Sequence, residues 1–234
     1  MKKDNSLYFV IPAYNEAAVI GEVAQNLLKQ GYKQIVIVND GSRDNTADIL
    51  KKIPIVALNH PINRGQGAAI ATGIEYCVRQ PDCRYIVTFD ADGQHRLEDV
   101  EAMLKEIKAS DVDIVLGSRF LSKKSEKMPV SRKIMLLGAT LFLRFLYGLK
   151  LSDAHNGLRL FKVEVARQVM PTVDNFVHAS EIPYLIKRNR LRYIEMPVTI
   201  DYTEYSLSKG QKTSNFLRVG KYTILHKLLS IFFD

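Results

Sequence analysis

Two aspartates separated by one residue are the feature of this sequence with the clearest chemical potential. Asp90 and Asp92 directly follow Tyr85–Phe89, an apolar run with the composition of a buried strand. Carboxylates at positions i and i+2 of a turn can face one hard cation, and Mg²⁺ prefers such oxygen ligands together with diphosphate oxygens. An Asp-x-Asp pair in a loop is more often a solvated turn. Here its position right after a buried strand, with Gln94-His95 next, favours a metal site.

Polar residues also follow four other apolar runs that have the length and composition of strands. These runs are Leu7–Ile11, Gln34–Val38, Ile55–Leu58 and Asp113–Leu116. The polar residues after them are Tyr14, Asn15 and Glu16; Asp40, Gly41 and Ser42; Asn63, Arg64 and Gly65; and Gly117, Ser118 and Arg119. Ligands of open α/β sheets bind beyond the carboxyl ends of the strands. The sequence therefore predicts one nucleotide-sized site formed by five converging loops.

Predicted helices separate these strands and would position the loops. They span Asn15–Gln30, Thr46–Lys52, about Ala68–Arg79, and Leu97–Lys108. Alternation of strand and helix is typical of an α/β domain with a mostly parallel sheet and right-handed crossovers. The fold class expected for the first half of the chain is therefore α/β.

The second half of the chain has a different pattern. Ile134–Leu149 is strongly apolar but is interrupted by Arg144, and Phe216–Phe233 mixes Phe, Leu and Ile with basic residues. Such stretches are usually buried helices. They could also lie in a membrane interface with their basic side chains near the headgroups, and Phe216–Phe233 has the stronger interfacial character.

Charge is divided unevenly along the chain. Residues 1–117 contain 13 Lys or Arg and 16 Asp or Glu, a net of −3, whereas residues 118–234 contain 20 and 9, a net of +11. The basic half predicts an anionic partner, which could be nucleic acid, an acidic membrane surface or a phosphorylated substrate. An acidic first half and the absence of a nucleic-acid-binding motif argue against nucleic acid.

Other common nucleotide-binding classes do not fit the glycine positions. Gly65-Gln66-Gly67 is followed neither by the Gly-Lys-Ser/Thr of a Walker A loop nor by the third glycine of a dinucleotide-binding loop, which disfavours a kinase or a dehydrogenase. Asp40-Gly41-Ser42 could be only a turn that caps a helix. The two cysteines, Cys77 and Cys83, have neither zinc-site nor disulfide-scaffold spacing, and no export signal is expected at the N-terminus.

Taken together, these segments resemble the family 2 glycosyltransferases of the GT-A fold, and more closely the dolichyl- and polyprenyl-phosphate glycosyltransferases. The resemblance runs from about residue 7 to 200. The segments that carry it are Val10–Glu16, Val38–Ser42 with Asp44 and Thr46, Asn63–Ala68, Asp90–His95, Gly117–Arg119, Ser131-Arg132 and Asp153–Phe161.

The resemblance implies roles for individual residues. Those that would bind the nucleotide-sugar donor are Pro12, Tyr14, Glu16, Asp40, Ser42, Arg64, Gly65, Asp90 and Asp92. Those that would hold Mg²⁺ or Mn²⁺ are Asp90, Asp92 and Gln94. Those that would bind the phosphate of a lipid acceptor are Ser118, Arg119, Arg132 and Lys209. The catalytic set implied is Asp92, Arg119, Arg132 and Asp153. Gln66 stands where the family often has Lys, so that donor-phosphate contact is either missing or replaced by Arg64.

The identity of the acceptor decides whether the reaction needs a general base. A lipid monophosphate has a second pKa of about 6, is substantially dianionic at neutral pH and attacks without a base. A sugar hydroxyl would need a carboxylate to take its proton, and Glu181 or Asp153 would serve. Glu181 could equally be a carboxylate on the surface or at the N-terminus of a helix, and Asp153 could orient an acceptor-site arginine. A nucleotide- or nucleic-acid-binding protein without enzymatic activity is a remote alternative.

We expect a glycosyltransferase domain over residues 1–205 and a basic amphipathic segment over residues 206–234 for a membrane interface or a partner. The predicted reaction is inverting transfer from a UDP- or GDP-sugar to polyprenyl phosphate. UDP-glucose and UDP-N-acetylglucosamine are favoured over GDP-mannose by the resemblance. The predicted location is peripheral, at the cytoplasmic face of the membrane, with a small integral-membrane protein as a candidate partner.

Overall fold

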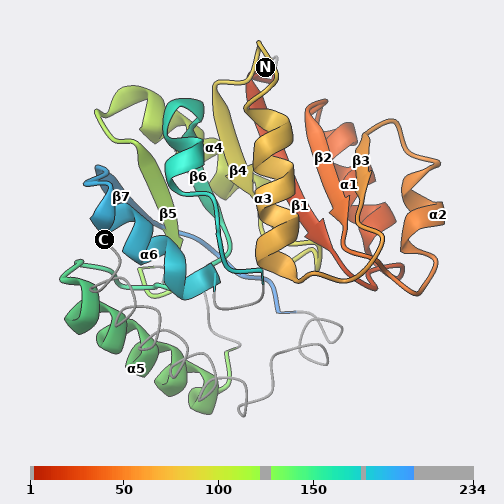
Figure 1. Ribbon diagram of the computed structural model, residues 1–234. Helices are drawn as coiled ribbons and strands as arrows, with labels where there is room; N and C mark the ends of the chain where they lie inside the picture. Colours follow the sequence, from red (N-terminus) through yellow and green to blue (C-terminus); the bar gives the residue numbers. More distant parts are fainter. Residues whose placement is uncertain (1–2, 122–127, 175–177, 203–234) are drawn as a thin grey trace.

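The computed structural model describes residues 3–121, 128–174 and 178–202, and it is built around a seven-stranded sheet with the order β3-β2-β1-β4-β6-β5-β7 (Figure 1). The strands are β1 (Leu7–Ala13), β2 (Ile35–Asn39), β3 (Val56–Asn59), β4 (Tyr85–Thr88), β5 (Ile114–Ser118), β6 (Arg159–Lys162) and β7 (Tyr193–Pro197). The helices are α1 (Ile20–Lys29), α2 (Thr46–Leu50), α3 (Gln66–Cys77), α4 (Leu97–Ala109), α5 (Val130–Tyr147) and α6 (His178–Arg188), with a 3₁₀ helix, η1 (Val163–Gln168).

The sheet is parallel except for β6. This strand lies between β4 and β5 and runs antiparallel to both, so that Arg159 pairs with Thr88 on one side and with Leu116 on the other. Because β6 is reversed, the loop that enters it lies at the same edge of the sheet as the loops that leave β4 and β5. The strand-to-helix loops of the first half also end at this edge, where the sequence predicts the site.

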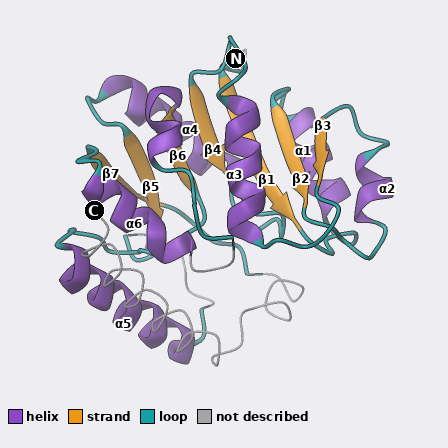
Figure 2. Ribbon diagram, viewed as in Figure 1, coloured by secondary structure: helices purple, strands orange, loops and turns teal. Residues whose placement is uncertain are grey.

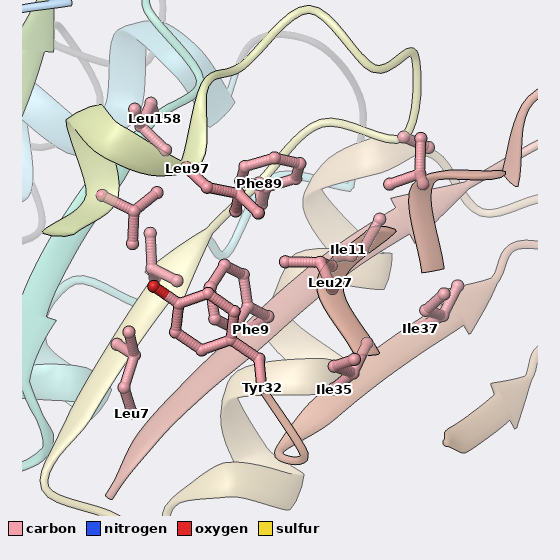
Figure 3. Close-up of a cluster of buried hydrophobic side chains, with 14 of the residues drawn as sticks. Leu7, Phe9, Ile11, Leu27, Tyr32, Ile35, Ile37, Phe89, Leu97 and Leu158 are labelled. Carbon is pink, nitrogen blue, oxygen red and sulfur yellow. The ribbon is translucent and has the colours of Figure 1, made fainter. Parts of the chain in front are cut away.

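Helices cover both faces of the sheet, and β1 shows how the two faces are separated (Figure 2). All seven of its residues are buried. Leu7, Phe9 and Ile11 belong to the core under α1 and α4 (Figure 3), whereas Tyr8 and Val10 belong to the core under α3 and α6. Near-continuous apolar sequence is what a central parallel strand covered on both sides requires.

Close packing fixes α3 against β1. A Cβ atom on Gly73 of α3 would lie 2.4 Å from Cγ1 of Val10, so the helix could not approach the strand this closely with any larger residue. On the opposite face, the ring of Phe9 meets Tyr32 edge-on at a centroid distance of 4.8 Å. Truncating a ring buried like that of Phe9 costs about 3–5 kcal/mol.

The predicted strands of the first half are confirmed to within one or two residues at each end, and three differences are informative. The first helix begins at Ile20 rather than Asn15, because Asn15 adopts a positive φ of 54° and belongs to a loop. The short strands β6 and β7 were not predicted. β6 has four residues and begins and ends with a basic residue, so its sequence carries little strand signal.

The apolar stretch 134–149 forms most of α5, and only one side of this helix is packed. Leu136, Thr140, Leu143 and Tyr147 are buried, whereas Phe145 is 91% exposed. The expectation of an ordinary buried helix therefore holds for half of its circumference. Within the described residues, no helix combines the length and apolarity needed to cross a bilayer. The predicted segment 206–234 lies outside the described residues, so the boundary at residue 205 remains a prediction.

Candidate active site

The loops that follow β1 and β2 are locked together by side chains that accept backbone hydrogen bonds. The Asn15 N–H donates to Ser42 Oγ at 2.9 Å, and the Glu16 N–H donates to Thr46 Oγ1 at 2.9 Å. The Ala17 N–H donates to the carboxylate of Asp44 at 3.1 Å. These contacts fix the loop that carries Tyr14 and Glu16 before any ligand binds.

Asp40 links the loop after β2 to the loop after β3. It is 2% exposed, and its carboxylate accepts hydrogen bonds from the N–H groups of Arg64 at 3.0 Å and Gly65 at 2.6 Å. His60 Nδ1 lies 2.7 Å from Asp40 Oδ1, and His60 Nε2 lies 2.9 Å from Thr72 Oγ1 of α3. Sequence reasoning missed His60, which carries no motif signal and acts only through partners that are distant in sequence.

The other predicted donor residues are placed differently from one another. Tyr14 is 38% exposed at the sheet edge, while Pro12 is buried inside β1, where it can shape the strand but presents no exposed side chain. The guanidinium of Arg64 lies 3.5 Å from Asp174 on the surface. Gln66 instead donates from Nε2 to Asp90 Oδ1 at 3.3 Å, so it is Gln66 that reaches the carboxylate pair.

Asp90 and Asp92 lie where the sequence predicts, directly beyond β4, and their pKa values differ. Burial and the neighbouring Asp90 carboxylate raise the pKa of Asp92 to about 6. Burial acts on Asp90 in the same direction, but the hydrogen bond from His95 and the positive charge of Arg159 hold the pKa of Asp90 below its usual range. Glu16 contributes a further negative charge near Asp92. Two neighbouring carboxylates repel each other when both are ionised, and a bound cation would offset this repulsion.

The carboxylate of Asp90 is held from two sides. His95 Nε2 lies 2.9 Å from Asp90 Oδ2, and the His95 ring meets Phe89 edge-on. On the other side the backbone of Gly157 presses against it, since a Cβ atom on Gly157 would lie 2.4 Å from Asp90 Oδ2. The sequence names His95 and Gly157 only as members of motifs. Their contacts identify them as positioning residues for Asp90.

The donor set around this pair fits a hard divalent cation. Among the described residues, no group of three or more His, Cys, Asp or Glu side chains is arranged to hold a metal. Asp90 and Asp92 with the amide of Gln94 leave coordination positions that water or substrate oxygens would fill. This matches Mg²⁺, which is usually held by one or two carboxylates together with substrate phosphates rather than by an all-protein cage.

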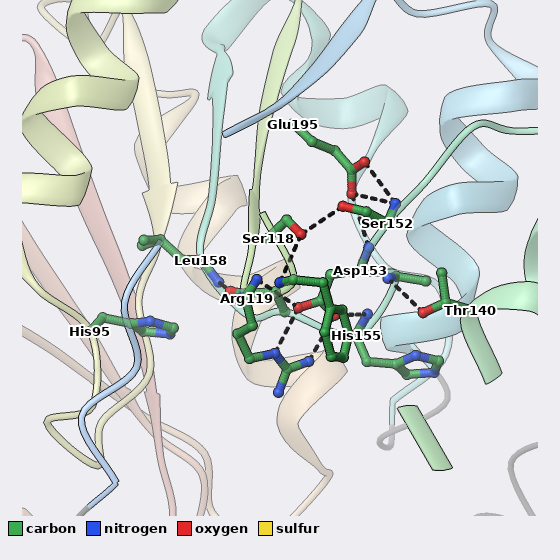
Figure 4. Close-up of polar contacts among 12 residues, drawn as sticks. His95, Ser118, Arg119, Thr140, Ser152, Asp153, His155, Leu158 and Glu195 are labelled. Atoms are coloured by element: carbon green, nitrogen blue, oxygen red, sulfur yellow. Dashed lines mark hydrogen bonds and ion pairs between the residues drawn. The ribbon is translucent and has the colours of Figure 1, made fainter. Parts of the chain in front are cut away.

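Arg119 and Asp153 form a buried, bidentate ion pair at the neighbouring position of the sheet edge (Figure 4). Arg119 Nε and Nη2 donate to the two carboxylate oxygens of Asp153 at 2.6 and 2.8 Å, and the Arg119 N–H donates to the same group at 3.1 Å. Burial opposes both charges, but each partner outweighs it, raising the pKa of Arg119 and lowering that of Asp153. The prediction that Asp153 could orient an arginine agrees with this geometry.

A chain of contacts from β5 to β7 supports this ion pair. Ser118 Oγ lies 2.6 Å from Ser152 Oγ, and the carboxylate of Glu195 accepts hydrogen bonds from the N–H groups of Ser152 and Asp153 (Figure 4). Ser118 has no exposed surface, so in this structure it supports the Asp153 loop. Its predicted contact with an acceptor remains a prediction. Glu195 was not predicted, because its partners lie 42 and 43 residues away in sequence.

Arg159 is a buried cation between the two carboxylate sites. It is 5% exposed, and the one hydrogen bond described for its side chain is a long one, from Nη2 to the Ala154 carbonyl at 3.5 Å. Burial lowers its pKa to about 10, while the charges of Asp90 and Asp153 act in the opposite direction. At neutral pH it therefore remains charged. No carboxylate of the described residues lies within ion-pair distance of it.

Of the remaining predicted residues, Glu181 lies in the described structure, whereas the side chains of Arg132 and Lys209 do not. Glu181 is 4% exposed in the first turn of α6, where its carboxylate accepts hydrogen bonds from the Thr172 and Val173 N–H groups at 3.1 Å and from the Thr172 hydroxyl. The helix-N-terminal position considered for it is confirmed, but it is buried rather than on the surface. Arg132 belongs to α5, yet its side chain lies outside the described part of the chain, as does Lys209.

Comparison with known proteins identifies the family. The model of glycosyl transferase family 2 matches residues 8–170. The chain is 33% identical over 227 residues to a UDP-N-acetylglucosamine–dolichyl-phosphate N-acetylglucosaminyltransferase of Methanococcus voltae, covering 88% of this chain and 90% of that protein. It is 31% identical over 241 residues to a dolichyl-phosphate beta-glucosyltransferase of Dictyostelium discoideum, covering 92% and 72%.

A solved structure supports the fold assignment. The crystal structure of glucosyl-3-phosphoglycerate synthase from Mycobacterium tuberculosis, in complex with Mn²⁺, uridine diphosphate and glucosyl-3-phosphoglycerate, has a TM-score of 0.70 to this chain at 14% identity. The match covers 94% of this chain and 77% of that one. The predicted family and fold class are confirmed: the chain belongs to glycosyl transferase family 2 and is a glycosyltransferase of the GT-A fold.

Proposed function

We propose that this glycosyltransferase moves a sugar from a nucleotide-sugar to a polyprenyl phosphate, by one direct displacement that inverts the anomeric centre and depends on Mg²⁺ or Mn²⁺. The relatives from Methanococcus and Dictyostelium are named for dolichyl-phosphate acceptors, which supports this acceptor class. The first is also named for UDP-N-acetylglucosamine, which supports a UDP-sugar as the donor.

Both candidate general bases already accept hydrogen bonds from other protein groups, and this observation carries the choice of acceptor. Glu181 accepts hydrogen bonds from the 172–173 loop, and Asp153 is paired at both oxygens with Arg119. A hydroxyl acceptor needs one of them to take a proton, whereas a phosphate dianion needs neither. The described site is therefore better suited to a phosphate acceptor than to a sugar hydroxyl.

The proposed mechanism places two anions side by side. Tyr14, Glu16 and the loop held by Asp40 would bind the base and ribose of the donor, and Asp90, Asp92 and Gln94 would hold the metal. When bound, the metal would neutralise charge on the diphosphate leaving group. Arg119, oriented by Asp153, would bind the acceptor phosphate near the anomeric carbon. Positioning and charge neutralisation would carry the catalysis.

The displacement balances without a proton carrier. An oxygen of the acceptor phosphate would form the new bond to the anomeric carbon, while the bond from that carbon to the donor diphosphate breaks. Both electrons of the broken bond leave with the nucleoside diphosphate. Arg159, charged and close to Asp90 and Asp153, would offset part of the negative charge that collects between the two sites.

The proposal includes a location. A polyprenyl phosphate is a membrane lipid, whereas a nucleotide-sugar is a water-soluble metabolite, so the enzyme would work as a peripheral protein at the cytoplasmic membrane face. The net charge of +11 over residues 118–234 suits an anionic surface. A small integral-membrane partner remains part of the proposal.

The decisive test is transfer of radiolabelled sugar from a panel of UDP- and GDP-sugars to undecaprenyl phosphate in membranes, with Mn²⁺ or with EDTA. Metal-dependent label in a lipid that releases its sugar under mild acid is expected. Arg119→Ala should raise the acceptor KM more than the donor KM. Donor turnover without any labelled lipid would contradict the phosphate acceptor and return attention to hydroxyl acceptors.

A further inference from the structure

Helix α5 has an apolar face that nothing in the described structure covers. Its exposed apolar residues are Val130, Ile134, Leu137, Leu141 and Phe145, which are 72%, 67%, 37%, 60% and 91% exposed. Their spacings of four, three, four and four residues place them in one stripe along the helix. The packed residues, including Leu136 and Leu143, lie on the opposite side.

The stripe concentrates exposed apolar surface in one place. Of the eight large hydrophobic residues exposed in the described chain, five lie on this helix. Single exposed hydrophobic residues are ordinary, but a contiguous apolar patch usually marks a surface that binds a partner or a membrane. Phe145, almost fully exposed near the end of α5, is not explained by the packing of the domain.

The charges on α5 identify the partner. The helix contains no Asp or Glu, and both Lys133 and Arg144 are exposed. Lys133 lies one turn from Leu137, and Arg144 lies one turn from Leu141, so cationic groups border the stripe. We propose that this face of α5 docks on an anionic phospholipid bilayer, with the apolar stripe in the interface and the two cations at the headgroups.

A second copy of the chain fits this face less well. Pairing two α5 stripes about a two-fold axis would bring basic helices together without a single acidic residue on either to offset them. An anionic bilayer has both components that this surface would bind, an apolar layer and negatively charged headgroups above it. The net charge of +8 for the whole chain acts in the same direction.

The position of α5 gives this docking a purpose, which rests on the proposed function. Figure 1 shows α5 beyond the end of the sheet toward which the arrows of β1 and β5 point. Thr140 Oγ1 on its packed side accepts a hydrogen bond from the Ala154 N–H at 3.3 Å, next to Asp153, and Tyr147 packs against Tyr184 of α6. A bilayer bound by α5 would therefore hold the Arg119–Asp153 pair near the phosphates of membrane lipids.

The test is co-sedimentation of the full chain with phosphatidylcholine vesicles, with or without phosphatidylglycerol, in the absence of metal and sugar donor. Leu141→Ser with Phe145→Ser should weaken binding to anionic vesicles at least about tenfold, the loss expected when two interfacial apolar side chains are removed. Lys133→Glu with Arg144→Glu should remove the preference for anionic vesicles. Ile62→Ser, an exposed apolar residue in a loop before α3, is the matched control and should bind like wild type.

Wild-type binding that ignores vesicle charge, or full binding by Leu141→Ser/Phe145→Ser, would overturn the proposal. A wild-type dimer that becomes monomeric in this variant by light scattering, with vesicle binding unchanged, would assign the stripe to a second copy instead. A short-chain, water-soluble prenyl phosphate separates docking from chemistry. The variant should match wild-type turnover with it and lose transfer only to undecaprenyl phosphate in vesicles. Vesicle binding lost on substitution in an enzyme that labels no prenyl phosphate would support docking and refute the proposed function.

Discussion

The two halves of the site are held together by different kinds of contact. Around Asp40 and Ser42, loops that follow neighbouring strands bind one another through single side chains that accept backbone hydrogen bonds. Around Arg119 and Asp153, charged groups pair with each other, and the support comes from β7 through Glu195. Backbone donors are used in both halves, but only the second is built around a buried arginine–carboxylate pair. The two should therefore respond to substitution in different ways.

The largest effect is expected where the two halves meet, at the carboxylate pair. Asp92→Ala should lower kcat by about a thousandfold or more, because charge on the leaving diphosphate would lose its stabilisation. EDTA should lower the activity of the wild-type enzyme to a similar level and have no further effect on the variant. Rates of sugar transfer with added Mn²⁺ and with EDTA would show this. Near-normal turnover of the variant with metal chelated would remove the metal from the mechanism.

Breaking the buried charge pair should cost stability and acceptor binding together. Asp153→Asn leaves the guanidinium of Arg119 buried and poorly paired, which costs about 3–5 kcal/mol in the free energy of unfolding. The acceptor KM should rise more than the donor KM. Asp48→Asn, which removes an exposed pair with Lys51, is the control and should leave stability close to that of the wild type. Urea unfolding of both variants would make the comparison.

The matching substitution in the donor half should give the opposite pattern. Asp40→Asn keeps the size of the side chain but replaces one acceptor oxygen with a donor that faces backbone N–H groups or His60. The expected cost is about 1–3 kcal/mol, with a rise in donor KM and little change in acceptor KM. Equal effects on both KM values would show that the two halves are not separate.

A methyl group on Gly157 tests whether the loop before β6 positions Asp90. Gly157→Ala places a Cβ atom 2.4 Å from Asp90 Oδ2, so the carboxylate must move. A shift of this kind should lower kcat/KM by roughly ten- to a hundredfold. Gly138→Ala on α5, where a Cβ atom meets nothing within 4 Å, is the matched control and should be silent. Activity of Gly157→Ala equal to that of the control would contradict the positioning role.

The smallest effect expected is a gain in stability. The folded pKa of Asp92, about 6, lies above the ordinary value of 3.8, so the ionised form destabilises the fold above pH 6 and this cost vanishes as pH falls toward 4. After allowance for partial exposure, Asp92→Asn should raise stability at pH 7.5 in EDTA by on the order of 1 kcal/mol, or roughly 2–4 °C in Tm. The gain should be absent at pH 4. Thermal unfolding at both pH values would test the sign.

The two halves also differ in how far they could be predicted from the sequence. The donor loops follow apolar strands, and the side chains that accept their hydrogen bonds belong to short motifs such as Asp40-Gly41-Ser42. Both the strands and the sheet edge at which they end could therefore be predicted. β6 and β7 could not, because four or five residues with charged members give no clear period. Arg119 and Glu195, which hold Asp153 in place, lie 34 and 42 residues away from it, and no local pattern specifies such pairs.

The reversal of β6 fixes a dimension of the enzyme. Gly157 contacts the carboxylate of Asp90, Asp153 holds Arg119, and only the three residues from 154 to 156 lie between them in the chain. A short covalent segment of three residues therefore limits the distance between the two anion-binding positions. An insertion or deletion in this stretch should therefore change how far apart the two substrates are held.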